Sequence, residues 1–292
     1  MTALSLHAKG LFFVVLALAG AAFTVLWFRV LWQTKPRPRP TAYELVVGVI
    51  TDFFDTLGIG SYATTTALYR LRRTVPDRLL PGTLNVGHTI PSLAQAFIYV
   101  AIVDVDPTTL ISMIASAALG ANLGARVVTR LPRRAIQIGL GVGLLVASVL
   151  LLAKQLDRFP RGGDTRGLEG GALVLACVAN FVLGALMTLG IGLYAPCMIV
   201  ISLLGMNAKA AFPIMMGSCA LLMIAASGRF VKAEAYSPKA ALGLTIGGLP
   251  AVLFAAWVVR SLPLASVRWL VLLVVLYTSV SMLRAAAKRD AP

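Results

Sequence analysis

Seven runs of apolar residues are each close to the length that a helix needs to cross a lipid bilayer. They lie at residues 10–32, 84–103, 107–125, 135–153, 210–228, 239–259 and 267–283. About 20 helical residues span roughly 30 Å of hydrocarbon, and a spanning helix satisfies its own backbone hydrogen bonds. The composition excludes a soluble domain, because 13% of the residues are charged, against about 25% in soluble domains. We therefore expect an all-α polytopic membrane protein.

Two further apolar stretches, residues 43–69 and 170–205, are interrupted by pairs of glycines. The glycines are Gly58 and Gly60 in the first stretch, and Gly190 and Gly192 in the second. Cytoplasmic loops accumulate Lys and Arg. If each stretch turns back near the midplane, 18 of the 26 basic residues fall on one side, whereas single crossings leave no bias. The charges thus predict two re-entrant hairpins in a multi-pass membrane protein with an external N-terminus and a cytoplasmic C-terminus.

An eight-residue segment recurs 132 residues further along the chain. Thr56–Ala63 (TLGIGSYA) returns as Thr188–Ala195 (TLGIGLYA), with one difference, and Pro81 and Pro213 keep the same spacing. A shared offset between separate landmarks indicates an internal repeat. We expect the two copies to fold alike, with the recurring glycines at the break of each hairpin.

The repeat divides the chain into five parts. They are an N-terminal transmembrane helix and basic linker (1–42), a first repeat (43–153), an external loop (154–169), a second repeat (170–284) and a cytoplasmic tail (285–292). A returning hairpin followed by three crossings leaves the second repeat on the opposite side of the membrane from the first. Inverted repeats with paired broken helices are typical of alternating-access transporters, whose substrate site lies at the repeat interface.

The paired glycine breaks, together with small-residue-rich helices such as residues 120–125 (GANLGA), resemble the sulfite exporter TauE/SafE family. The resemblance covers residues 43–284. It implies a secondary transporter that moves sulfite, sulfoacetate or a similar organosulfonate across the inner membrane, with export as the expected direction and proton coupling as a further hypothesis.

Helices that begin at Ser61 and Leu193 would direct unpaired backbone N–H groups toward the midplane, where they favour an anion. Nearby hydroxyl groups would add donors, although the glycines would equally suit close helix packing. The expected substrate-binding residues are Thr56, Gly58, Gly60, Ser61, Tyr62, Thr64, Asn85, His88, Ser92, Thr188, Gly190, Gly192 and Tyr194.

The helix after Pro81 carries one polar stripe, formed by Asn85, His88, Ser92 and Gln95. A polar stripe faces other helices rather than lipid, either along a substrate pathway or as polar contacts between helices.

Asp52 and Asp55 lie one turn apart on a predicted membrane helix, where carboxylates are costly and therefore indicate function. We identify Asp52, Asp55 and His88 as candidates for carrying a proton coupled to transport. A hydrogen-bonded pair with a purely structural role is the alternative.

No motif predicts catalytic residues, a cofactor or a metal site, and Cys177, Cys197 and Cys219 lie in apolar runs without metal-ligand spacing. The basic residues lie in short loops, which indicates orientation rather than nucleic-acid binding. The expected partners are the bilayer and a small anion, and a homo-oligomer is left open. Two other functions stay open, a lipid-phosphate phosphatase-like enzyme that uses His88 and Ser92, and an anion channel.

Overall fold

The computed structural model describes residues 3–158, 162–258, 273, 276, 277, 279, 280 and 282–287. Within these residues the chain is helical and contains no strand. Six helices are long and apolar enough to cross a membrane, judged by length and composition. The prediction of an all-α polytopic membrane protein is therefore confirmed. Most of the predicted run at 267–283 and of the tail at 285–292 lies outside the described residues.

Ten α-helices and two short 3-10 helices follow one another between residues 3 and 258, and the described residues 282–287 are helical as well. They are α1 (Ala3–Gln33), α2 (Ala42–Thr56), α3 (Ser61–Leu71), η1 (Asp77–Leu79), α4 (Leu80–Ile102), α5 (Pro107–Val128), α6 (Arg133–Gln155), α7 (Gly170–Met187), α8 (Tyr194–Leu203), η2 (Ala208–Ala210), α9 (Ala211–Lys232) and α10 (Pro238–Val258). Helices α2, α3, α4 and α5 have counterparts in the same order in α7, α8, α9 and α10, and the residue offset between counterparts is close to that of the sequence repeat. Whether the two copies are inverted stays a prediction.

Both glycine breaks end a helix with the same hydrogen bonds. The Gly58 N–H donates to the Asp55 carbonyl (2.8 Å) and the Gly190 N–H donates to the Met187 carbonyl (2.9 Å), while the next residue in each copy donates one residue further back. In both turns the glycine has a positive φ, 78° for Gly58 and 106° for Gly190. This is the Schellman motif, in which a left-handed glycine satisfies the last helical carbonyl groups.

Each broken segment folds back, so that its end lies beside its start. At one end of the bundle the Tyr43 hydroxyl donates to the Leu68 carbonyl across 2.7 Å, whereas an unbroken helix would separate these residues by about 37 Å. At the other end the Asn207 N–H, after α8, donates to the Thr165 carbonyl, before α7, across 2.8 Å. Both segments therefore fold back on themselves, whereas their re-entrant placement in a membrane stays a prediction.

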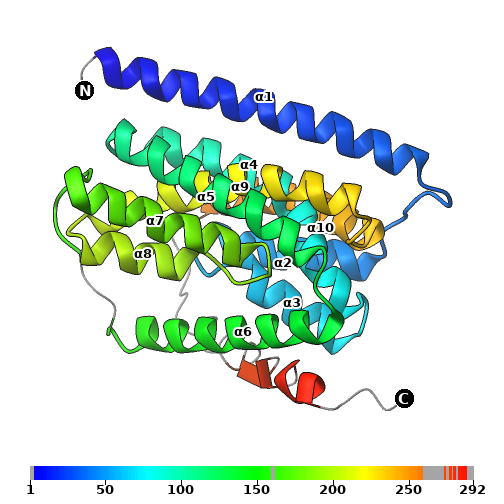
Figure 1. Ribbon diagram of the computed structural model, residues 1–292. Helices are drawn as coiled ribbons and strands as arrows, with labels where there is room; N and C mark the ends of the chain where they lie inside the picture. The colour runs from blue at the N-terminus through cyan, green and yellow to red at the C-terminus, as the bar shows by residue number, and fades with distance from the viewer. Residues whose placement is uncertain are drawn as a thin grey trace.

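The central helices of the two copies are interleaved (Figure 1). Helix α4 packs against α9, α2 packs against α10, and α5 packs against α7. Glycines bring the backbones together, because a Cβ on Gly120 of α5 would overlap the Phe181 carbonyl of α7, and one on Gly247 of α10 would overlap the Leu45 carbonyl of α2. Helices α1 and α6 lie on opposite sides of this bundle (Figure 1).

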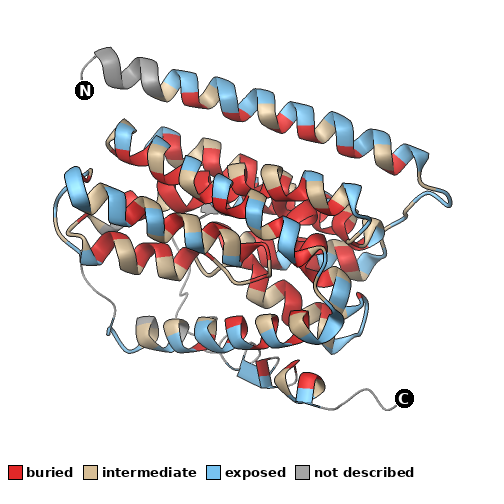
Figure 2. Cartoon of the chain, viewed as in Figure 1, coloured by how far each residue is buried: buried red, intermediate tan, exposed pale blue. Residues whose placement is uncertain are grey.

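Burial is greatest in the middle of the bundle and falls toward α1 and α6 (Figure 2). Helix α9 buries most of its apolar window, whereas α1 exposes large apolar side chains such as Leu11 and Leu18. Apolar residues exposed along the outer helices are expected of a surface that faces lipid. Helix α4 is as long as its neighbours but is not among the six candidate spans, because its polar residues lower its mean hydropathy; these residues, Asn85, His88, Ser92 and Gln95, are buried inside the bundle.

Candidate functional site

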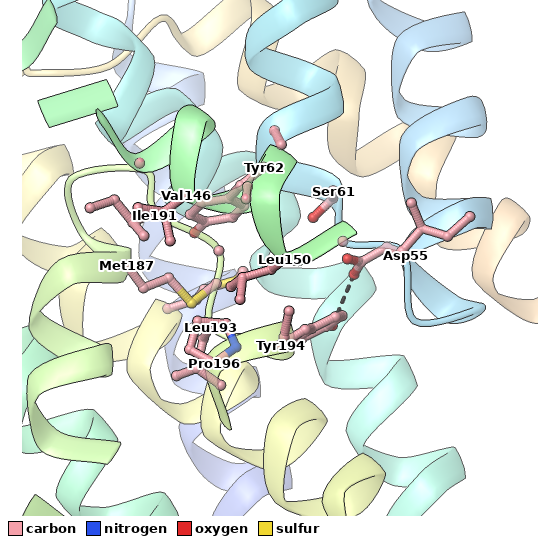
Figure 3. A pocket seen from close by; sticks show the side chains of 18 residues that line it. Asp55, Ser61, Tyr62, Val146, Leu150, Met187, Ile191, Leu193, Tyr194 and Pro196 are labelled. Carbon is pink, nitrogen blue, oxygen red and sulfur yellow. Dashed lines mark hydrogen bonds between the residues drawn. The ribbon is translucent and has the colours of Figure 1, made fainter. Parts of the chain in front are cut away.

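A cavity of about 60 Å³ lies between the two glycine breaks. The first break contributes Ile59 to Ala63, and the second contributes Ile191 to Pro196. Figure 3 shows Asp55 and Tyr194 at one end of this cavity, with Met187 and Ile191 away from them. The segments that recur in the sequence thus meet in space, as expected of paired breaks.

The start of α3 supplies the polar side of the cavity. Helix α3 begins at Ser61, directly after Gly60, whose φ of 93° turns the chain into the helix. The first N–H groups of a helix have no partner within the helix and carry its positive dipole end. The Ser61 hydroxyl lies among the lining groups (Figure 3). Helix α8 begins at Tyr194, one residue later than the sequence predicted, and the residue before it, Leu193, already has a right-handed helical backbone (φ −80°, ψ −26°).

Asp55 is joined to the second half of the chain through Tyr194. The Tyr194 hydroxyl lies 3.0 Å from Asp55 Oδ2 and 3.2 Å from Gln95 Oε1, so it can donate to either group. The Ser61 backbone and the Gln95 side chain lie beside Asp55, and Gln95 Nε2 donates to the Thr56 hydroxyl across 3.1 Å. The carboxyl group is therefore held by helices of both halves and has only neutral hydrogen-bond partners.

The rest of the cavity wall is apolar and comes largely from α6 and from two methionines. These residues are Gly143, Val146, Ala147, Leu150, Met187 and Met223. No Lys or Arg is among the described residues that line the cavity. Any anion held there is bound by dipoles and hydroxyl groups rather than by a cationic side chain.

Asp52 belongs to a separate, fully buried chain of hydrogen bonds. Its Oδ1 lies 2.8 Å from His88 Nδ1, and His88 Nε2 lies 3.0 Å from the Thr65 hydroxyl. A Cβ on Gly248 would overlap the other carboxylate oxygen, so the missing side chain on α10 makes room for Asp52. These contacts tie α2, α3 and α4 together beside the cavity.

A hydroxyl, an imidazole and a carboxylate in this order are also the parts of a nucleophilic triad. Here Asp52, His88 and Thr65 are completely buried, and none of them lines the cavity. The Ser92 hydroxyl has no hydrogen-bond partner, so it is not paired with His88 as the phosphatase hypothesis requires. The geometry therefore gives no support to an enzyme built on His88 and Ser92.

The structure brings five of the predicted substrate-binding residues to the cavity. They are Gly60, Ser61, Tyr62, Gly192 and Tyr194. The two glycines of the helix ends, Gly58 and Gly190, shape the turns without lining the cavity. Asn85, His88 and Ser92 also lie outside the lining.

Three predicted hydroxyl donors bond to nearby backbone carbonyl groups. Thr56 donates to Asp52 (2.8 Å) and Thr64 to Ser61 (2.8 Å), and Thr188 donates to Ala185 (2.7 Å). Such local bonds are common for threonine in helices. These three hydroxyl groups are therefore occupied in this conformation.

A second hollow, of about 460 Å³, lies beside the end of α3 and the start of α6. Its charged residues are Arg70, Arg73, Asp77 and Arg133. The single carboxylate, Asp77, pairs with Arg70 and accepts a hydrogen bond from Gln137 at 2.7 Å. Positive charge is therefore in excess in this hollow.

Sequence reasoning missed the part of the site that depends on packing between distant helices. Neither the α6 wall nor the basic hollow could be placed without knowing that α6 lies beside α3 and α8. The small residues Gly139 and Gly143 on α6 were the available signal, since a Cβ at either would overlap Leu189 or Ile191 of the second break.

Comparison with known families gives one match. The family model described as sulfite exporter TauE/SafE matches residues 1–151, from α1 through most of α6, and thus includes the first glycine break. No curated protein matches the chain.

Proposed function

Because the chain belongs to the sulfite exporter TauE/SafE family, we propose that it carries a small sulfur-containing oxyanion across the inner membrane by alternating access, in the direction of export. The N-terminus would lie outside and the C-terminus in the cytoplasm, as the distribution of basic residues favours. Coupling to protons is part of the proposal.

The observation that carries this proposal is the cavity between the two breaks. Two half-helices begin at its wall, at Ser61 and Tyr194, and would present N–H groups to a substrate, as paired broken helices do in transporters. The three oxygens of sulfite or a sulfonate group suit several donors that converge from different directions. A volume of about 60 Å³ favours the smallest members of the substrate class in this conformation.

The absence of a cationic side chain from the described lining suits a carrier that has to release its cargo. A guanidinium group in an apolar cavity would hold an oxyanion through strong, charge-assisted hydrogen bonds. Dipoles and hydroxyl groups bind more weakly and leave the anion free to dissociate.

The positive charge of the basic hollow would attract anions. Charge of one sign in a concave surface raises the local concentration of oppositely charged solutes. Both α3 and α6 run from this hollow, at Arg70 and Arg133, to the central cavity, at Ser61 and Gly143. A path between these two helices would join the hollow to the cavity.

Flux measurements on a matched pair of glycine variants test the proposal. In Gly192→Leu the new side chain would fill the cavity, while Gly192 has no atom within 4 Å of its Cβ position and no positive φ. In Gly228→Leu the new side chain would lie on an exposed part of α9, away from the cavity. Uptake of radiolabelled sulfite into proteoliposomes should be lost in the first variant and kept in the second. Equal flux in both variants would contradict the assignment of the site.

A ligand screen tests the substrate class. Thermal shifts in detergent should be larger with sulfite than with sulfoacetate or taurine, since the cavity is small. A larger shift with sulfoacetate would show that the binding conformation is wider than this one.

A further inference from the structure

The proposed anion cavity contains an acidic group. Among the described residues that line it, Asp55 is the one with a side chain that is ordinarily charged at neutral pH. An anion about 5 Å from an ionised carboxylate in a poorly solvated site would be repelled enough to weaken binding on the order of a hundredfold. Anion binding in this cavity therefore depends on whether Asp55 is ionised or neutral.

The two buried carboxyl groups of α2 differ in their surroundings. Asp52 has His88 as a partner that can carry positive charge, at 2.8 Å, and it does not line the cavity. Asp55 lines the cavity, and it accepts a hydrogen bond from the neutral Tyr194 hydroxyl, with the Gln95 side chain and the Ser61 backbone beside it. A neutral, protonated carboxyl group suits the second environment, because a proton removes the unpaired charge from the apolar wall.

Tyr194 allows this change without leaving a buried group unsatisfied. Its hydroxyl donates to Asp55 Oδ2 when the carboxyl group is ionised, and Gln95 Oε1 lies 3.2 Å away as a second acceptor. When Asp55 is protonated, the Tyr194 hydroxyl can turn to Gln95, and the new Asp55 O–H becomes a donor at the cavity wall. Protonation of Asp55, with rotation of the Tyr194 hydroxyl, therefore replaces a negatively charged group at the cavity wall by a hydrogen-bond donor.

We propose that Asp55 is the proton site of this carrier and that each anion binds in the cavity together with one proton on Asp55. The proton comes from water and adds to a carboxylate oxygen, and no bond of the anion changes. This inference rests on the transport function proposed above. It assigns Asp52 and His88 to a positioning role, since they hold α2 and α4 in place beside the cavity.

Several titratable groups face Asp55 from the helices packed around it. They are Asp52 on α2, Tyr62 on α3, His88 and Tyr99 on α4, Tyr194 on α8 and Cys219 on α9. Tyrosine and cysteine side chains are neutral at physiological pH. Asp52 and His88 are therefore the two other groups whose titration has to be separated from that of Asp55.

Calorimetric binding of methanesulfonate and of sulfite to the full chain in detergent tests the inference. Methanesulfonate carries one charge throughout the range from about pH 5 to pH 9, so its own titration does not contribute. Titrations in two buffers of different ionisation enthalpy give the number of protons taken up per anion bound. The wild type should take up one proton at high pH, and its affinity should fall about tenfold per pH unit where Asp55 is ionised.

The Asp55→Asn variant should bind methanesulfonate without proton uptake and with an affinity that is independent of pH. The Asp52→Asn variant should keep the proton uptake even if it is less stable. Asp104→Asn, in the loop after α4 and far from the cavity, should behave as the wild type. Proton uptake that persists in Asp55→Asn, or that is lost in Asp52→Asn alone, would overturn the assignment.

A second variant keeps the inference testable if Asp55→Asn fails to fold. Tyr194→Phe removes the donor to the ionised carboxylate, so the pH at which anion affinity begins to fall should move upward by about one unit. An unchanged pH profile in Tyr194→Phe would contradict the inference. Anion binding by the wild type without proton uptake would refute the role of Asp55 alone, whereas no anion binding at any pH would refute the proposed function as well.

Discussion

The two glycines that follow the helix ends offer a matched test of the break geometry. Gly60 and Gly192 occupy equivalent positions in the repeated segment, and neither has an atom within 4 Å of the position where a Cβ would lie. They differ in the backbone, because Gly60 has a φ of 93° and Gly192 is not among the glycines with positive φ. The Gly60→Ala and Gly192→Ala variants therefore separate backbone strain from steric overlap.

The expected magnitudes follow from this difference. An L-residue in the left-handed region costs roughly 1–2 kcal/mol, so Gly60→Ala should lower the free energy of unfolding by about that amount. At Gly192 the alanine meets no such strain, and the loss of chain entropy in the unfolded state should stabilise the protein by about 0.4–1 kcal/mol. The two variants should thus differ by at least about tenfold in their unfolding equilibrium constants.

Reversible unfolding in mixed micelles of a mild detergent and sodium dodecyl sulfate, followed by circular dichroism, measures this difference. Gly58→Ala should be more damaging than Gly60→Ala, since its Cβ would also lie 3.2 Å from the Phe212 ring. Equal destabilisation by Gly60→Ala and Gly192→Ala would refute the conclusion that the two breaks differ in backbone conformation.

Three further perturbations follow from side-chain contacts. His88→Ala should lower the free energy of unfolding by about 3–5 kcal/mol, measured in the same micelles, because it leaves the Asp52 carboxylate buried without its partner. Arg73→Gln should raise the KM for sulfite and weaken its dependence on salt concentration, measured by flux at several ionic strengths, because it removes charge from the basic hollow. The hydrogen bond from Lys9 lowers the pKa of Asp104. The stability that this exposed pair adds is therefore present at neutral pH and is lost as the pH falls through the lowered pKa. Unfolding measured at a series of pH values can follow this loss.

Each of these three perturbations has a control experiment. For His88→Ala, a double-mutant cycle with Asp52→Ala isolates the coupling, and strictly additive losses would show that the two side chains do not support each other. For Arg73→Gln, Arg166→Gln removes an exposed arginine at the other end of the bundle and should leave KM unchanged. For the acid dependence, Asp104→Asn should remove the small change, and its persistence would point to another carboxyl group.

The helix breaks could be predicted because their cause is local. A left-handed glycine after Thr-Leu ends a helix through its own backbone hydrogen bonds, and both copies of the segment do this in the same way. The return of the first broken stretch was also accessible, because the distribution of Lys and Arg predicted that it turns back and the Tyr43 to Leu68 contact shows its two ends side by side.

The pairing of the polar side chains could not be predicted from spacing. The i, i+3 relation placed Asp52 and Asp55 on one face of α2, yet Asp52 contacts His88 on α4 and Asp55 contacts Tyr194 on α8. These partners are 36 and 139 residues away in sequence, and only the packing of α2 against its neighbours decides which carboxyl group faces the cavity. The inverted relation between the two copies and the anion itself remain predictions.

The central claim is that the anion lies between the two glycine breaks, and a structure with a heavier analogue tests it most directly. Crystals soaked with selenite would locate selenium by its anomalous scattering. The account predicts a selenium peak inside the cavity, placed so that the selenite oxygens lie within hydrogen-bond distance of the α3 start at Ser61 and beside the α8 start at Tyr194. A peak confined to the basic hollow at Arg73 and Arg133, with the cavity empty, would contradict it.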